Sequence, residues 1–141
     1  MLVGAGDIAT CTNNNDEATA KLLDSIPGTV FTAGDNAYDS GTDAEFANCY
    51  EPTWGRHKAR TKPTPGNHEY LTEGAAGYFN YFGTAAGDRD KGYYSYDLGE
   101  WHIVALIYCD NGRGIDPLQV KGVRVWQRLC SLKRSVSSPS R

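Results

Sequence analysis

The chain lacks the features that mark a membrane protein, a zinc finger or a thioredoxin-like protein. No run reaches the roughly 18 apolar residues of a membrane span, and no basic segment followed by an apolar run stands at the N-terminus. Four cysteines are present without a Cys-x-x-Cys pair, which argues against zinc-finger and thioredoxin-like sites. With 141 residues, 40% of them hydrophobic, the chain is long enough for one domain with a core. We expect no membrane partner, and the localisation stays open.

Acidic residues are missing from the last part of the chain. All 17 Asp and Glu residues lie at or before Asp116, and residues 118–141 are basic and rich in Ser and Arg. This change of composition predicts a domain over residues 1–117 and a poorly ordered tail over residues 118–141. We expect the tail to come from a frame-shifted or truncated end. A basic arm that binds nucleic acid is the alternative.

The cysteines and histidines are few and widely spaced. Cys11, Cys49, Cys109 and Cys130 allow one or two disulfides in an exported protein, and Cys109 with Cys130 would close a local loop. Buried free thiols are an equal alternative. We expect His57, in a basic run, to lie at the surface, and His102 to be a hydrogen-bonded histidine of a strand.

In the first half of the chain, apolar runs alternate with a helical pattern. Residues 2–5 and 29–33 are predicted strands, and a helix is expected between them. The asparagines at 13–15 offer its cap, and Pro27-Gly28 ends it. Its expected buried face is formed by four residues: Ala18, Leu22, Leu23 and Ile26. A second short helix is predicted over residues 43–49.

The second half predicts a poor strand, a short helix and a β-hairpin. Residues 60–65 contain two prolines, so this strand should lie at a sheet edge or pair briefly. Residues 75–82 suit one or two helical turns that pack Tyr78, Phe79 and Phe82. Residues 93–108 read as a hairpin turning at Gly99-Glu100. The continuously apolar run 103–107 should be buried on both faces.

Three polar clusters open the loops that follow these strands. Alternation of strands and helices predicts an α/β layer fold, in which sites gather beyond the carboxyl ends of the strands. The clusters are about one βαβ unit apart, so neighbouring strands can bring them to one sheet edge. Their sequences are Gly6-Asp7, Gly34-Asp35-Asn36-Ala37-Tyr38 and Gly66-Asn67-His68-Glu69.

These residue types suit a site that holds two metal ions for phosphoryl transfer. Such a site needs a carboxylate to bridge the ions, and Asp35 is placed for that role. Asp7 supplies an anionic oxygen to the first ion, and Asn67 supplies an amide oxygen to the second. His68 is the candidate catalytic residue, because an imidazole can protonate the departing oxygen or hold a phosphate oxygen.

The ordered set of clusters resembles the calcineurin-like metallophosphoesterase superfamily. Tyr38 makes it most similar to the purple acid phosphatase branch, in which a tyrosine three residues after the bridging aspartate binds a ferric ion. Many relatives carry a histidine two residues after the first aspartate, where this chain has Ala9. The resemblance implies a layered metallophosphoesterase fold and a phosphate ester substrate. It also implies two divalent or trivalent metal ions, iron together with zinc, manganese or a second iron.

The resemblance covers residues 2–108, the N-terminal half of such a domain. The later family motifs, a histidine after a strand and a Gly-His-x-His segment, have no counterpart, and no histidine follows His102. We therefore expect an incomplete fold with weak metal binding and little or no turnover by this chain alone. The uncovered sheet surface should favour self-association. A non-catalytic binding domain is the main alternative, and a nucleic-acid-binding module that uses the tail is the lesser one.

Overall fold

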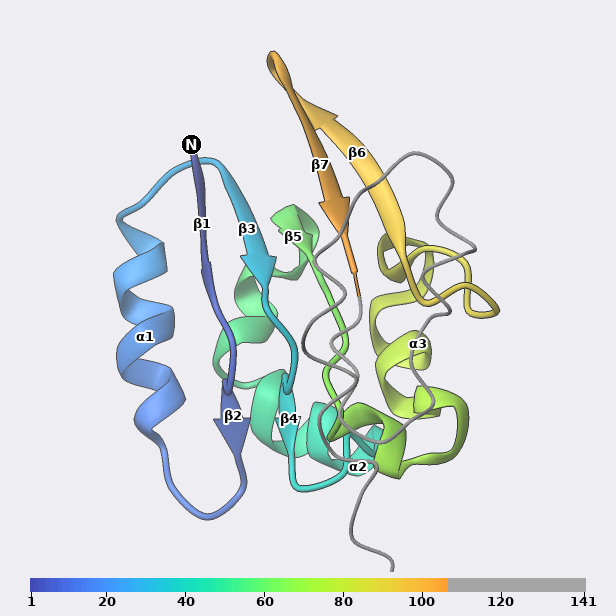
Figure 1. The fold of residues 1–141 in the computed structure, drawn as a ribbon. Coiled ribbons are helices and arrows are strands. Elements are labelled where there is room, and N and C mark those ends of the chain that lie inside the picture. The colour runs from blue at the N-terminus through green and yellow to red at the C-terminus, as the bar shows by residue number, and fades with distance from the viewer. Residues whose placement is uncertain (107–141) are drawn as a thin grey trace, which may run out of the picture.

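A three-stranded parallel sheet forms the centre of the protein, whose computed structural model describes residues 1–106. Its strands are β1 (Leu2–Ala5), β3 (Thr29–Thr32) and β5 (Thr61–Lys62), in the order β1-β3-β5. β3 pairs with both neighbours, and its Val30 is fully buried. β5 is short and lies at an edge, as the prolines around it predict. The predicted mixed α/β class is confirmed (Figure 1).

A second, two-stranded parallel ladder continues beyond the sheet. It consists of β2 (Ala9–Thr10) and β4 (Ala37–Tyr38), with Ala9 opposite Ala37 and Thr10 opposite Tyr38. The connecting backbone is also paired, because the amide of Asp7 donates to the Gly34 carbonyl over 3.2 Å. The segments after β1 and β3 therefore run side by side beyond the sheet.

Helix α1 (Asn15–Asp24) lies between β2 and β3 in sequence, as predicted, but of the four residues of its predicted buried face only Leu23 is buried. Its buried residues are Asp16, Ala20 and Leu23, whereas Ala18 is exposed and Leu22 is 64% exposed. The reason is a set of polar contacts made by Asp16, which the hydrophobic periodicity of the sequence does not predict. The hydroxyl of Thr53 donates to the Asp16 carboxylate, and the indole N–H of Trp54 donates to the Asp16 carbonyl over 3.2 Å.

The prediction that His57 lies at the surface is wrong. His57 belongs to the 3-10 segment η2 (Trp54–Arg60) and is 6% exposed. Its Nε2 is 3.1 Å from the Ala20 carbonyl, and the Arg60 guanidinium donates to its Nδ1 over 3.2 Å. Since a guanidinium only donates, Nδ1 accepts from Arg60, and Nε2 is the donor that faces the Ala20 carbonyl and the Asp24 carboxylate. His57 therefore joins η2 to α1.

An aromatic core lies on the helical side of the sheet. The predicted helix at 43–49 appears as α2 (Asp43–Glu45), which continues into the π-helical segment η1 (Phe46–Tyr50). The predicted helix at 75–82 appears as α3 (Ala76–Phe82), and it buries the three aromatic residues expected there. Short 3-10 segments flank it: η3 (Glu69–Leu71), η4 (Glu73–Ala75) and η5 (Gly83–Ala86). The largest core side chains are Trp54, Tyr50, Tyr78, Phe46, Phe79 and Phe82.

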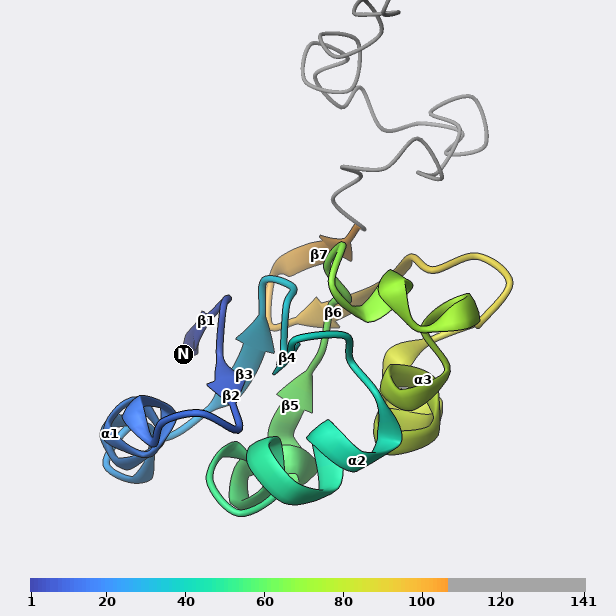
Figure 2. The ribbon, with the colours of Figure 1, turned by 90° about the horizontal axis from the view of Figure 1, so that it is seen from below.

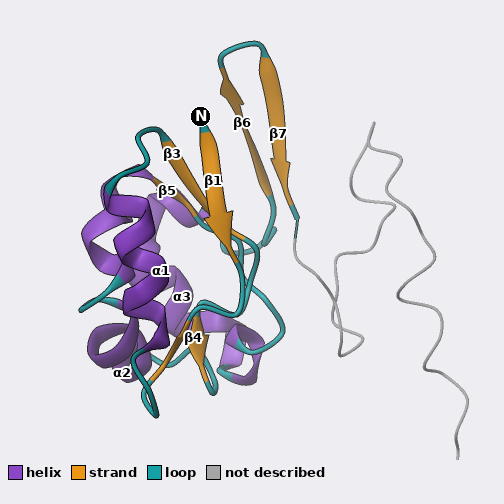
Figure 3. Cartoon of the chain, turned by 90° about the vertical axis from the view of Figure 1, so that its left-hand side faces the viewer, coloured by secondary structure: helices purple, strands orange, loops and turns teal. Residues whose placement is uncertain are grey.

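The predicted hairpin is present as β6 (Tyr94–Leu98) and β7 (Trp101–Ala105), which pair antiparallel. Figures 2 and 3 show the hairpin on one side of the three-stranded sheet and helices α1 and α2 on the other. The prediction that this strand is buried on both faces is wrong for Ile103–Ala105, which are only half-buried. Among residues 1–106, β7 pairs with β6 alone, so one apolar face stays partly open. His102 is exposed and contacts Asp97 over 2.7 Å.

In the part of the chain that the structure describes, no helix is long and apolar enough to cross a membrane.

Cys11 and Cys49, two of the four cysteines of the chain, form a disulfide with each other. The possible pairing of Cys109 with Cys130 and the predicted tail at 118–141 lie outside the described residues.

Replacing Arg60 should destabilise the fold, because its guanidinium caps the end of α1. It donates to the carbonyls of Leu23, Ile26 and Gly28 over 2.7, 2.8 and 2.9 Å. We expect Arg60→Ala to lower the free energy of unfolding by about 2 kcal/mol, since hydrogen bonds from charged donors are lost. Urea denaturation measures the change. Lys21→Ala, at an exposed position of α1, is the control and should cost less than about 0.5 kcal/mol.

Candidate metal centre

The three polar clusters meet at the carboxyl edge of the sheet, as their spacing predicts. The phenol of Tyr38 donates a hydrogen bond to Oδ1 of Asp7, and its oxygen lies 3.2 Å from Oδ2 of Asp35. The loop after β5 joins them, because the amide of His68 donates to Oδ1 of Asp35 over 3.0 Å. Four of the five predicted site residues are thus in direct contact: Asp7, Asp35, Tyr38 and His68.

Glycine is needed where the loops after β3 and β5 cross. Gly34 has a φ of +93°, and a Cβ built on it would lie 2.9 Å from Cα of Gly66. A Cβ on Gly66 would lie 2.1 Å from Oδ1 of Asp35. Any side chain at either position would push the two loops apart. Asp7 and Asp35 themselves adopt left-handed backbone conformations, with φ of 52° and 51°. Aspartate tolerates this conformation better than most residues, and such strain gathers at functional sites.

A buried carboxylate holds the same loops together from inside. Glu69 has no exposed surface, and its Oε1 accepts from the amides of Asn36 and Ala37 over 2.7 and 3.2 Å. Its Oε2 accepts from the amides of Asp35 and Gly66 over 3.0 and 2.6 Å. The sequence places Glu69 in the third cluster without revealing this role. A signal was present, because a carboxylate among glycines often accepts backbone N–H groups.

Opposing effects act on the ionisation of Glu69. Burial raises the pKa of this carboxyl, and the nearby Asp35 charge acts in the same direction. Hydrogen bonds from the amides of Gly66, Ala37 and Asn36 lower the pKa, because they favour the charged form. Burial outweighs these hydrogen bonds, so the pKa of Glu69 is raised overall, and its charged form depends on the amides that remain aimed at it.

His68 is oriented by a backbone carbonyl. Its Nδ1 lies 2.6 Å from the carbonyl oxygen of Asp39, and its ring packs edge-on against Tyr38 with 4.5 Å between centroids. Since a carbonyl only accepts, Nδ1 carries a proton. In the neutral ring Nε2 is then an acceptor, and protonation makes it a donor. His68 is thus equipped to hold or deliver a proton at Nε2.

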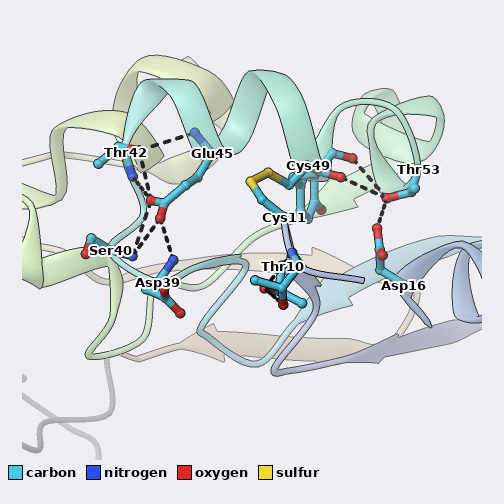
Figure 4. The surroundings of a disulfide bond; sticks show 11 residues. Thr10, Cys11, Asp16, Asp39, Ser40, Thr42, Glu45, Cys49 and Thr53 are labelled. Atoms are coloured by element: carbon cyan, nitrogen blue, oxygen red, sulfur yellow. Dashed lines mark hydrogen bonds between the residues drawn. A yellow bond between two sulfur atoms is a disulfide. The ribbon is translucent and has the colours of Figure 1, made fainter. Parts of the chain in front are cut away.

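The loop that supplies this carbonyl is fixed by Glu45 at the start of α2. The Glu45 carboxylate accepts from the amides of Asp39, Ser40 and Thr42 and from the Thr42 hydroxyl, while the Glu45 amide donates back to that hydroxyl (Figure 4). This arrangement is a capping box. Desolvation raises the pKa of Glu45, but the hydrogen bonds from Thr42, Asp39 and Ser40 outweigh it and lower the pKa.

The ligand atoms present suit one hard cation better than they suit two. Asp7, Tyr38 and Asp35 bring three oxygens together, the ligand type that ferric and other hard ions prefer. Within residues 1–106 the amide side chain of Asn67 makes no hydrogen bond, either to the other predicted ligands or elsewhere. No group of three or more His, Cys, Asp or Glu side chains suited to a metal occurs in these residues. Of the four predicted metal ligands, only Asp7 and Asp35 are of these residue types. The other two are Tyr38 and Asn67.

Tyr38 is held in its phenol form by its neighbours. Burial, the hydrogen bond to Asp7 and the charge of Asp35 all raise its pKa. A cation among the three oxygens would reverse this balance, because its positive charge favours the phenolate and offsets both carboxylates.

A basic hollow lies at the opposite end of the sheet, where β3 and β5 begin. Arg56, Arg60, Lys58 and Lys62 line it above Phe82. Arg56 is engaged by Glu17 and Asp24, and Arg60 by the end of α1. Lys58 and Lys62 lie over the rings of Tyr81 and Tyr96, so all four cations already have partners in the fold, which leaves the carboxyl edge as the better candidate site.

Comparisons with known proteins do not identify a family for this chain. No family model matches the chain. No curated protein and no solved structure matches it either. The assignment to the metallophosphoesterases therefore stays a proposal, supported by the residues at the carboxyl edge and by their geometry.

Replacing Glu69 by glutamine should loosen the centre while keeping the size of the side chain. One oxygen becomes an NH2 group that faces backbone N–H donors, so two buried amides lose their acceptor. We expect Glu69→Gln to cost about 3 kcal/mol of unfolding free energy, measured by chemical denaturation. Glu73→Gln, at an exposed position of the next short helix, is the matched control and should be neutral. Equal stability of the two variants would contradict the role given to Glu69.

Proposed function

We propose that the protein is a metal-dependent phosphoesterase of the purple acid phosphatase type that acts on phosphate monoesters. The contact of Tyr38 with both Asp7 and Asp35 carries the proposal. A phenol between two carboxylates, all three at the carboxyl ends of parallel strands, has little purpose in packing, because Asp7 is exposed. It does create an oxygen cage for a hard, highly charged ion.

Each side chain then has a separate task. Asp7 and Tyr38 would hold the first metal ion, iron by the resemblance, and Asp35 would bridge it to the second, which Asn67 would also hold. The ions, when bound, supply positive charge against the phosphate and an acidified water as nucleophile. His68 would hold a phosphate oxygen or protonate the departing alcohol, since its Nδ1 is fixed on Asp39 and its Nε2 is free for that purpose.

The second metal position is short of ligands. Asp35 and Asn67 are its donors in residues 1–106, and both are oxygen ligands, whereas the resemblance implies histidine nitrogens. We therefore propose that this chain alone binds the second metal weakly and turns over little or no substrate. The same shortage favours the alternative of a domain that kept the fold and lost the chemistry. Metal content after dialysis separates the two, because retention of at least the first metal ion supports the proposed centre and a metal-free protein supports the degenerate domain.

Tyr38 should give a visible signature when ferric iron is bound. A tyrosinate on Fe³⁺ absorbs visible light by charge transfer, so iron-loaded protein should be coloured. We expect Tyr38→Phe to abolish this band and to weaken iron binding by more than about tenfold, because an anionic ligand is removed. Tyr96→Phe, on the hairpin, is the matched control and should keep the colour. A colourless iron-loaded protein would argue against Tyr38 as a ligand.

Asp35 should be essential for metal retention. Asp35→Asn removes the charge of the proposed bridge and keeps its shape, so we expect the dialysed variant to hold less than about a tenth of the iron or zinc of the parent chain. Asp90→Asn, at an exposed position, should bind like the parent chain. Hydrolysis of p-nitrophenyl phosphate is expected to be at or near background for the parent. Robust turnover that Asp35→Asn abolishes would refute our expectation of an inactive half-site.

A further inference from the structure

The Cys11–Cys49 disulfide connects the strand that follows Asp7 to the helix that holds the loop after Tyr38. Its Cα atoms are 5.1 Å apart, and it links residues 38 positions apart in sequence. Cys11 directly follows β2 and is exposed, whereas Cys49 lies in η1 and is 7% exposed. Figure 4 shows the bond joining the end of β2 to the helix above it.

On the Cys11 side, the disulfide closes the end of a very short ladder. The segment from Asp7 to Thr10 is held to the loop of Asp35 by the amides of Ile8 and Ala9, which donate to the carbonyls of Asp35 and Asn36 over 2.9 and 3.0 Å. β2 and β4 are registered at only two positions. Ladders this short have little stability of their own.

On the Cys49 side, the disulfide reaches the helix that positions Tyr38 and His68. η1 continues from α2, whose Glu45 holds the amides of Asp39 and Ser40 (Figure 4). In turn, the carbonyl of Asp39 accepts a hydrogen bond from Nδ1 of His68. One covalent bond therefore fastens the strand that follows Asp7 to the helix that holds the loop after Tyr38.

Little else fastens the segment that carries Cys11. Within the described residues, the side-chain hydrogen bonds of residues 10–15 are local: Thr10 with Thr12, and Asn13 with the amide of Asn15. Cys11 to Asn15 are all exposed. Loss of the disulfide would leave the ladder to be held by its backbone pairs and by the packing of Ile8 and Ala9 against the core.

We propose that this disulfide is a redox control of the metal centre: its reduction loosens the Asp7 strand and lowers the affinity for metal. The proposal rests on the proposed function, because it concerns the same ligands. An exposed Cys11 makes the bond accessible to a dithiol reductant. One thiolate of the dithiol attacks the Cys11 sulfur and releases the Cys49 thiolate, giving a mixed disulfide. The second thiol displaces Cys11, so the dithiol is oxidised to a disulfide and its two protons end on Cys11 and Cys49.

The first test follows the backbone without any metal. The full chain carries Cys109→Ser and Cys130→Ser, so that Cys11 and Cys49 are its only thiols, and amide hydrogen exchange is measured before and after reduction with dithiothreitol. We expect exchange at Ile8 and Ala9 to become at least about tenfold faster, with little change at Phe31 and Thr32 in β3. A uniform change over all these amides, or no change, would overturn the proposal, because the bond would then stabilise the whole fold or nothing.

The second test measures metal binding. Free thiols bind metals themselves, so the reduced state is represented by Cys11→Ser with Cys49→Ser in the same background. We expect this variant to bind Fe³⁺ at least about tenfold more weakly than the disulfide form, followed by the visible band or by calorimetry. Equal affinity in the two forms would overturn redox control alone. No Fe³⁺ binding in either form would overturn the proposed function, even if the exchange experiment had shown the predicted local loosening.

Discussion

The candidate centre depends on one buried interaction, the Glu69 carboxylate inside a ring of four backbone amides. Two of these amides, of Asn36 and Ala37, belong to the loop after β3, and that of Gly66 belongs to the loop after β5. A carboxylate without exposed surface is costly, and the cost is offset here only because every oxygen is met by two donors. The fourth amide is that of Asp35 itself, so the same interaction that joins the loops also sets the backbone of the proposed bridging ligand.

Much of this edge could be predicted from the sequence. The apolar runs at residues 2–5 and 29–33 pair in parallel, as the intervening helix implies, and parallel strands bring their carboxyl ends to one edge. Asp7 and Asp35 therefore lie side by side at this edge, and Tyr38 follows Asp35 in β4, which pairs with β2. Gly34 and Gly66 open two of the predicted clusters, but the close crossing of the two loops at these glycines appears only in the structure.

What the sequence did not reveal was decided by partners distant in the chain. The rotation of α1 follows from Thr53 and Trp54, which bind Asp16 of that helix, and a hydrophobic pattern gives no weight to a buried acid. His57 looked exposed among basic neighbours, yet Arg60 and the Ala20 carbonyl supply its hydrogen bonds. Whether a polar group can be buried depends on its hydrogen-bond partners, and local periodicity of the sequence does not show partners that are distant in the chain.

The two oxygens of Asp35 face different parts of the edge, which is the arrangement that a bridging carboxylate requires. Oδ2 accepts from the Tyr38 phenol, which also contacts Asp7, and Oδ1 accepts from the amide of His68. The Tyr38 phenol and the His68 amide hold this orientation, and the metal is not needed to create it. Preorganised ligands lose little freedom on binding, so affinity at this edge is limited by the number and type of donors. The first metal position has three oxygens in contact, whereas the second has two, which is why we expect the first ion to bind more tightly.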